Sequence, residues 1–236
     1  MFARFNKTQG SGLLNSPLRG VSATTNEASP QQPALRLSML RSYHVADLLT
    51  LANVSAGTAS TLMMMSYLVT PQGWRVNVAL TLLVLALVFD VVDGKIARWR
   101  HEQSWFGREL DSLADIVSFG VAPVAVAYAL GMRGSVDALI LVFFVGCGVS
   151  RLARFNITAA QLSNEKGKVK YFEGMPISSS MLLILVLAVC FYMGRIGDNL
   201  PLGSIEIASF QWHPLSITYF ANGCAMISRR LRIPKP

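Results

Sequence analysis

The sequence is poor in charged residues and in cysteine, and both scarcities exclude classes of protein. Only 14% of the 236 residues are charged, against about 25% in an average soluble domain, which argues against a water-soluble globule. The three cysteines lie far apart in apolar runs, so they cannot form the framework of a small disulfide-rich scaffold. Because 52% of the residues are hydrophobic, the chain is not of the disordered class. Its composition predicts a membrane protein.

Six stretches are long and apolar enough to be membrane helices, since a span needs about 20 mainly apolar residues. We predict an all-α integral membrane protein with six transmembrane helices over residues 45–69, 76–98, 110–132, 136–155, 177–193 and 207–227. Pro214 interrupts the last stretch and would disturb a helix there.

The second stretch carries charge into the membrane. Its apolar run, residues 76–89, is too short to span a bilayer alone, so the helix must include Asp90 and Asp93. Lipid exposure costs an intramembrane charge about 2.5 to 3.5 kcal/mol on insertion scales, and such charges therefore face a bundle interior or a wet cavity. The sequence predicts a buried acidic site at this helix end.

Basic residues are distributed unevenly over the connections. In a six-helix bundle all but three of the 21 lysines and arginines lie on one side, and the exceptions are Arg75, Arg133 and Arg195. The positive-inside rule places both termini and the acidic site in the cytosol. The net charge of +8 then comes mostly from the basic residues that orient the helices in the membrane. No soluble basic surface is left that could bind nucleic acid. We expect membrane lipids as neighbours and no nucleic acid.

Residues 1–40 differ from the rest, being rich in Ser, Asn, Gln, Pro and Gly and lacking an apolar core of signal-peptide length. We interpret them as a disordered cytosolic tail, followed by a membrane catalytic domain over residues 41–236. Arg4, Lys7 and Arg19 precede the first acidic residue, Glu27. A mitochondrial presequence is therefore an alternative interpretation of this segment.

Four aspartates are spaced as two helical pairs. Asp90 and Asp93 are three residues apart and Asp111 and Asp115 four apart, so each pair occupies one face of its helix. The short connection makes the two helices antiparallel neighbours. Four crowded carboxylates repel unless protonated or bound to cations, and such oxygen ligands select Mg²⁺ or Mn²⁺. We expect two ions about 3.5 to 4 Å apart, which suit an in-line displacement on a diphosphate.

Small and basic residues accompany the aspartates. Gly94 and Ala97 lie on the face of Asp90 and leave room for a ligand. Arg98 could clamp a phosphate, and Gly107, just ahead of the third helix, would let a ligand approach the backbone. Taken singly, Gly94 and Ala97 are more often helix-packing residues than ligand contacts, and Arg98 is most simply a positive-inside charge, but the joint spacing of these residues with the four acids favours a ligand site. A cation transporter or channel is the alternative, since intramembrane acids also mark ion pathways.

These residues also carry a resemblance. The pattern Asp-x-x-Asp-Gly-x-x-Ala-Arg, eight residues, then Gly-x-x-x-Asp-x-x-x-Asp is complete from Asp90 to Asp115 and is similar to the signature of the CDP-alcohol phosphotransferases. The segments 107–123, 151–156, 170–176 and 232–236 resemble the serine-using branch of that family, most closely its fungal members. The likeness extends from about residue 40 to the end.

The resemblance implies the six-helix fold of that family, a homodimer and two divalent cations, Mn²⁺ or Mg²⁺. It implies an enzyme that transfers the phosphatidyl group of CDP-diacylglycerol to the hydroxyl of L-serine, giving phosphatidylserine and CMP. The expected place is the endoplasmic reticulum membrane, with a mitochondrial membrane as the alternative. Within the family, inositol or glycerol phosphate is the alternative acceptor.

The resemblance further implies roles for individual residues. The metal ligands would be Asp90, Asp93, Asp111 and Asp115. Asp115 would also be the catalytic base that takes the serine hydroxyl proton. The CDP-diacylglycerol site would be bordered by Asn53, Gly94, Ala97, Arg98 and Gly107. Serine would be bound by Arg151, Arg154 and Phe155. The positive-inside rule explains the presence of both arginines equally well.

Overall fold

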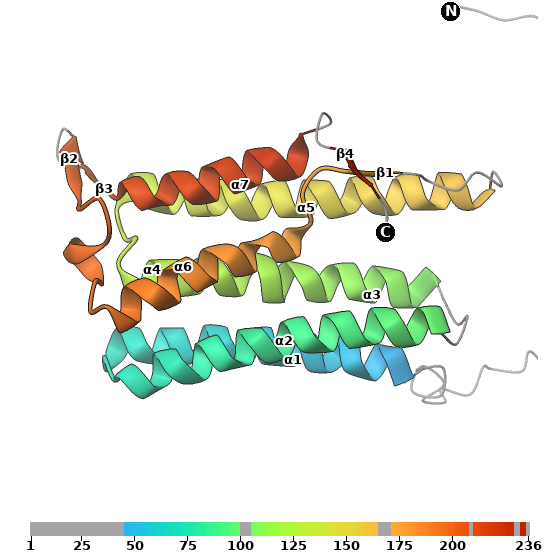
Figure 1. The fold of residues 1–236 in the computed structure, drawn as a ribbon, viewed down its shortest axis with the longest axis horizontal. Helices are drawn as coiled ribbons and strands as arrows, with labels where there is room; N and C mark the ends of the chain where they lie inside the picture. Colours follow the sequence, from blue (N-terminus) through green and yellow to red (C-terminus); the bar gives the residue numbers. More distant parts are fainter. Residues whose placement is uncertain (1–44, 100–104, 165–170, 208–209, 229–231, 235–236) are drawn as a thin grey trace, which may run out of the picture. The chain divides into compact units, whose positions relative to one another are not determined.

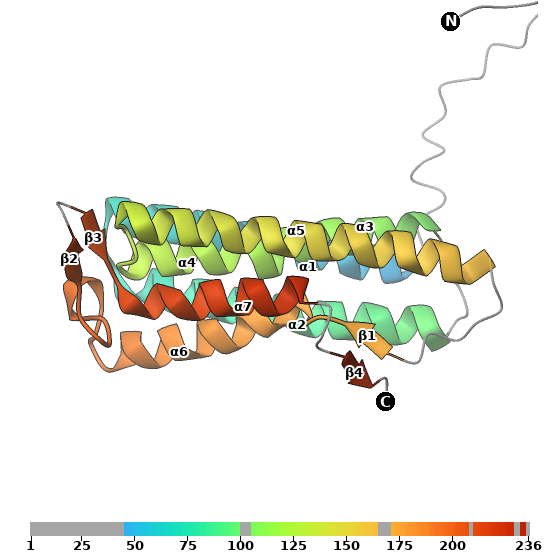
Figure 2. The same ribbon diagram turned by 90° about the horizontal axis from the view of Figure 1, so that it is seen from above.

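The structure, a computed structural model, describes residues 45–99, 105–164, 171–207, 210–228 and 232–234. Its helices run side by side in both views of Figures 1 and 2. They are α1 (Val45–Val69), α2 (Gly73–Trp99), α3 (Trp105–Asp115), α4 (Ala122–Leu130), α5 (Ser135–Asn164), α6 (Ser180–Tyr192) and α7 (Ile217–Ile227). A π-helical segment, η2 (Ile116–Val121), joins α3 to α4. The predicted tail over residues 1–40 lies outside the described residues.

Short 3-10 turns and two small antiparallel sheets complete the described chain. The turns are η3 (Ile177–Ser179), η4 (Gly197–Asn199) and η5 (Pro214–Ser216). The sheets pair β1 (Tyr171–Glu173) with β4 (Arg232–Pro234), and β2 (Ile205–Ile207) with β3 (Phe210–Trp212). In Figure 1 the two sheets lie toward opposite ends of the bundle.

The chain is a membrane protein. Four helical segments are long and apolar enough to cross a bilayer, and they are Ala46–Val69, Gly73–Ile96, Phe106–Leu130 and Ser135–Ile157. They coincide with the first four predicted spans, so helices of sufficient length and hydropathy are confirmed at these four places. The apolar helix Ile177–Tyr192 is shorter and α7 is shorter still, so the predicted count of six spans is not confirmed by length.

The sixth predicted span begins in the wrong place. We expected a helix from residue 207, whereas β2 and β3 pair in this region and α7 starts only at Ile217. Pro214 has no N–H to donate and opens the turn η5. The N–H of His213 donates instead to the Asp137 carboxylate at 3.0 Å.

Two other helices extend beyond their predicted limits. Helix α3 begins at Trp105 and not at residue 110, so Gly107 lies inside its first turns and not ahead of them. Helix α5 continues to Asn164, past the expected end at residue 155. Charged and polar residues such as Arg108, Glu109 and Asn156 interrupt the apolar runs in these extensions, and a search for apolar runs therefore cuts them off.

A buried acid–imidazole pair fastens the segment before α7 to the start of α5. Asp137 and His213 are 0% and 1% exposed, and Asp137 Oδ2 lies 2.7 Å from His213 Nδ1. The same carboxylate accepts the N–H of Gly134 at 3.3 Å. One carboxylate thus satisfies three donors at the end of the bundle where β2 and β3 lie.

We expect Asp137→Ala to destabilise the protein by roughly 3 to 5 kcal/mol, because it leaves buried donors without an acceptor. Thermal unfolding of the detergent-purified protein measures this effect. Asp198→Ala, at an exposed acid in η4, is the control and should leave the melting temperature unchanged. Equal melting temperatures of Asp137→Ala and wild type would contradict the role of this contact.

Candidate metal centre and active site

The fold brings the two aspartate pairs together. Asp90 and Asp93 lie near the end of α2, and Asp111 and Asp115 lie on α3. One carboxylate oxygen each of Asp90, Asp93 and Asp111 fall within 4.8 Å of one another. Asp115 lies one helical turn beyond Asp111 on α3, and its carboxyl group interacts electrostatically with those of Asp111 and Asp90. All four acids therefore form one group, which we call the aspartate cluster.

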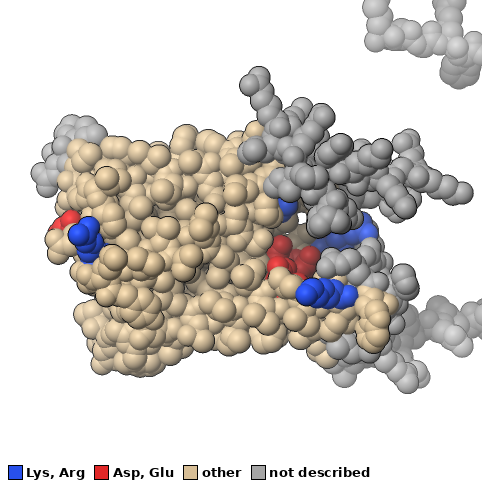
Figure 3. Space-filling view, viewed as in Figure 1, with Lys and Arg blue, Asp and Glu red and all other residues tan. Residues whose placement is uncertain are grey.

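The aspartate cluster lies in a hollow. Figure 3 shows acidic side chains at the bottom of a recess with basic side chains at its border, toward the end of the bundle away from β2 and β3. Asp93 is 4% exposed, whereas Asp90, Asp111 and Asp115 are half-buried. The cluster is thus open on one side to a ligand and enclosed by helices on the others.

The donor set fits divalent cations. Oδ1 of Asp111 and Oδ1 of Asp115 are buried and have no hydrogen-bond partner among the described residues. Buried acceptors without partners are costly, and four neighbouring carboxylates also repel one another. A hard divalent cation bound by these oxygens would relieve both penalties. The assignment of the four acids as metal ligands stays a prediction.

A hydroxyl of α1 orients Asp93. Thr50 donates this hydroxyl to Asp93 Oδ2 at 2.8 Å, in a buried contact. The contact ties the aspartate pair of α2 to α1, and the sequence analysis did not predict it.

The candidates for the CDP-diacylglycerol site are only partly visible. Asn53 on α1 is 0% exposed, and neither polar atom of its amide has a hydrogen-bond partner among the described residues. Gly94 and Gly107 are half-buried on the two helices that carry the aspartates. Ala97 and Arg98 belong to α2, but their side chains lie outside the described part of the structure.

The two arginines proposed for serine have different surroundings. Arg151 on α5 is half-buried, its Nε has no hydrogen-bond partner among the described residues, and it interacts electrostatically with Asp115. Its guanidinium carbon lies 6.0 Å from the ring centroid of Phe155. Arg154 instead donates to the carbonyl of Ile227 at the end of α7, at 3.4 Å. Arg151 therefore adjoins the aspartate cluster, whereas Arg154 links two helices.

The sequence analysis missed several contacts around the site. Asn156 on α5 donates to Glu109 Oε2 at 3.0 Å and lies 3.1 Å from Ser112 Oγ, so it ties α5 to the helix turn that bears Asp111. Strand β1 precedes α6 in the sequence and strand β4 follows α7, and the two strands pair with each other. Asn156 and these strands lie in the segments 151–156, 170–176 and 232–236, which carry the family likeness. That likeness was the one sequence feature that pointed to these residues.

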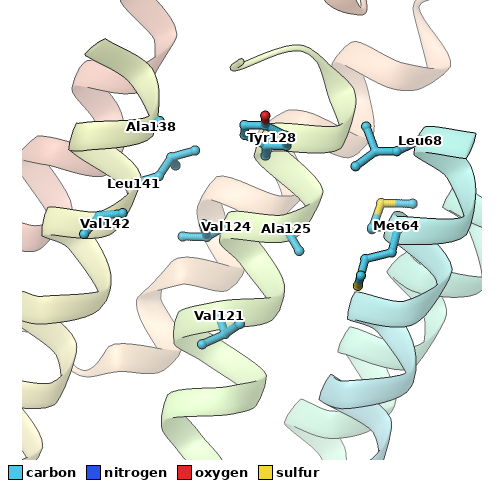
Figure 4. A pocket seen from close by; sticks show the side chains of 10 residues that line it. Met64, Leu68, Val121, Val124, Ala125, Tyr128, Ala138, Leu141 and Val142 are labelled. Carbon is cyan, nitrogen blue, oxygen red and sulfur yellow. The ribbon is translucent and has the colours of Figure 1, made fainter. Parts of the chain in front are cut away.

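A separate apolar groove of about 330 Å³ lies between α1, α4 and α5 (Figure 4). Its lining includes Met64 and Leu68 of α1, Val121 and Tyr128 around α4, and Leu141 of α5. None of the described residues that line it is charged. The groove can accept apolar chains but offers no acid–base or metal chemistry, so it is not the candidate active site.

Comparison with known proteins agrees with this site. The sequence profile described as CDP-alcohol phosphatidyltransferase matches residues 43–213. The chain is 45% identical over 202 residues to a CDP-diacylglycerol–serine O-phosphatidyltransferase of Saccharomyces cerevisiae, covering 84% of this chain and 73% of that protein.

More distant relatives come from an archaeon and a bacterium. The chain is 35% identical over 165 residues to the archaetidylserine synthase of Methanothermobacter thermautotrophicus, covering 69% of this chain and 63% of that protein. It is 34% identical over 146 residues to a CDP-diacylglycerol–serine O-phosphatidyltransferase of Helicobacter pylori, covering 61% of this chain and 56% of that protein.

Proposed function

Because the chain belongs to the CDP-alcohol phosphatidyltransferase family, we propose that it transfers the phosphatidyl group of CDP-diacylglycerol to the hydroxyl of L-serine. The products are phosphatidylserine and CMP. The observation that carries this proposal is the 45% identity to the yeast serine-using enzyme over 84% of this chain. The aspartate cluster supplies the carboxylate ligands for the divalent cations of this reaction.

The four aspartates would hold two divalent cations, Mg²⁺ or Mn²⁺, at the place where the diphosphate of the substrate reacts. When bound, such cations neutralise phosphate charge and polarise the phosphorus under attack. The protein's part is to keep the carboxylates at the required separation and to shield them from bulk water. Asp90, Asp93 and Asp111, whose oxygens lie within 4.8 Å, are the ligands that the geometry supports best.

Asp115 is the base. As serine attacks, a bond forms between its hydroxyl oxygen and the phosphorus that bears diacylglycerol, and the bond from that phosphorus to the CMP oxygen breaks. The hydroxyl proton passes to the Asp115 carboxylate, and CMP leaves with the electron pair. The buried Oδ1 of Asp115 supports this role, because it has no hydrogen-bond partner among the described residues and can accept that proton.

Arg151 binds the serine carboxylate. It adjoins Asp115 on the enclosed side of the site and has an unused buried N–H, so a bidentate pair with the substrate would place the serine hydroxyl near the base. Phe155 lines the same region, and Arg154 supports it from the α5–α7 contact. Asn53, Gly94, Ala97, Arg98 and Gly107 border the nucleotide.

We expect Arg151→Gln to raise the KM for serine about 10-fold to 100-fold, the value of a lost charge-assisted hydrogen bond. The KM for CDP-diacylglycerol should change little. Arg151→Lys keeps the charge but not the bidentate geometry and should give an intermediate value. Steady-state kinetics with Arg195→Gln, an exposed arginine beyond α6, as the control test this. An unchanged KM for serine would refute the assignment.

The same family membership supports the remaining proposals. Helices α6 and α7 cross the membrane as the fifth and sixth spans, since both run alongside the four longer ones (Figures 1 and 2). The protein lies in the endoplasmic reticulum membrane, with the aspartate cluster and both termini on the cytosolic side. It is a homodimer. Cysteine-accessibility mapping in sealed microsomes and the mass of the detergent-solubilised protein test these statements.

The activity itself is tested with purified protein, CDP-diacylglycerol and labelled serine. We expect labelled phosphatidylserine and an equal amount of CMP, and neither product without CDP-diacylglycerol. Competition with unlabelled inositol and glycerol phosphate should leave the serine product unchanged. A lipid product formed from one of these alcohols in place of serine, or ion flux without CMP release, would overturn the proposal.

A further inference from the structure

The α-helix α3, which carries Asp111 and Asp115, does not continue as a regular α-helix beyond Asp115. The π-helical segment η2 starts at the residue after Asp115, and the N–H of Ala122 closes it by donating to the carbonyl of Val117. Pro123, one residue further, has no N–H and interrupts the regular ladder here. Such π-helical turns are rare and occur frequently at functional sites. The irregular turn must therefore be held by contacts outside the segment.

Helix α1 supplies these contacts. Ser118, in the middle of η2, donates its hydroxyl to the carbonyl of Asn53 at 3.0 Å, and both residues are 0% exposed. At Gly57 a Cβ would lie 2.4 Å from Ser118 Oγ and 2.7 Å from Ser118 Cα. The backbone of α1 thus touches η2 directly, and only glycine at position 57 permits this approach.

The same face of α1 also holds the other half of the aspartate cluster. Thr50, Asn53 and Gly57 are spaced three and four residues apart, so they lie along one face of the helix. Thr50 bonds Asp93 on α2, and the carbonyl of Asn53 bonds Ser118, three residues beyond Asp115. Both aspartate pairs are therefore tied to α1, one through Asp93 and the other through Ser118. The two residues of α1 that make these contacts lie within about one helical turn of each other.

We propose that this face of α1 sets the distance between the aspartate pair of α2 and the aspartate pair of α3, with Thr50 and Ser118 as positioning residues of the metal centre. The clustered carboxylates repel one another, which tends to spread α2 and α3 apart. The hydroxyls of Thr50 and Ser118 oppose that spreading through α1. The proposal rests on the proposed function only in taking the aspartate cluster as a divalent-cation site.

The test is cation affinity, measured with Mn²⁺ alone on the detergent-purified full chain. Electron paramagnetic resonance of free Mn²⁺ gives the dissociation constant. We expect Thr50→Val to weaken binding about 10-fold to 100-fold, the usual effect of losing a hydrogen-bond partner of a metal ligand. Ser118→Ala acts on Asp115 only through the backbone and should weaken binding about 10-fold, at the low end of that range. Thr50→Ser keeps the hydroxyl and should therefore keep the wild-type dissociation constant for Mn²⁺.

Matched controls are available on α1. Thr58 and Ser55 are exposed and donate their hydroxyls to the carbonyls of Val54 and Leu51 on the same helix. Thr58→Val and Ser55→Ala make the same chemical changes away from the cluster and should leave Mn²⁺ affinity unchanged. Melting temperatures of all variants, recorded without cation, report folding separately.

The outcomes are distinguishable. Wild-type Mn²⁺ affinity in folded Thr50→Val and Ser118→Ala would overturn the proposal, whatever happens to turnover. If either variant fails to fold, the other one decides. A wild-type protein that binds no Mn²⁺ would also overturn it. If the variants lose affinity as expected but wild type makes no phosphatidylserine, the proposed function is wrong and the role of α1 stands.

Discussion

Replacing Asp111 with asparagine is expected to lower phosphatidyl transfer by about a thousandfold or more and to leave the protein folded. The asparagine side chain has the same size but lacks the charge that holds a divalent cation. Metal-derived stabilisation of the transition state amounts to several kcal/mol, and each 1.36 kcal/mol corresponds to about a tenfold change in rate. A carboxylate oxygen of Asp111 lies within 4.8 Å of oxygens of Asp90 and Asp93, so the substitution removes one charge from the group of three that the geometry supports best as ligands.

The effect on stability should have the opposite sign. Without cations, Asp111→Asn removes one of four repelling carboxylates, so its melting temperature should equal or exceed that of wild type. The measurements are CMP release and thermal unfolding with and without Mn²⁺, and Asp198→Asn at the exposed acid of η4 is the control. Normal turnover in Asp111→Asn would contradict the metal assignment.

Removing divalent cations from the wild-type protein should abolish turnover to background. The aspartate oxygens would then lack their charge partners, and serine attack on the diphosphate would lose its electrostatic support. Mn²⁺ or Mg²⁺ added in excess should restore the rate. Chelation should also lower the melting temperature, because a ligand that binds only the folded state stabilises it by about 2.7 kcal/mol at 100 times its dissociation constant.

The control for this experiment is EDTA already saturated with Mg²⁺, which should change neither rate nor melting temperature. Asp111→Asn should show no melting shift on chelation, since its site is already lost. Full turnover of the wild-type protein after exhaustive dialysis against EDTA would show that the aspartate cluster serves some purpose other than binding catalytic cations.

Local sequence was enough to predict the membrane segments and the spacing of the acids. The first four spans follow from long apolar runs, because the bilayer imposes a minimum length on any helix that crosses it. The face shared by Asp90 and Asp93 follows from helical periodicity. The predicted start of the sixth span at residue 207 was wrong, because Pro214 and the contact of His213 with Asp137 override hydropathy in that region.

By itself, then, the sequence determined the membrane environment, the family and the helices on which the acids lie, since hydropathy and periodicity are properties of neighbouring residues. Only the tertiary structure decided how far apart the two aspartate pairs stand. That distance depends on the contacts of Thr50 with Asp93 and of Ser118 with Asn53. Each contact joins residues more than 40 positions apart, and helix packing, which no local pattern records, brings them together.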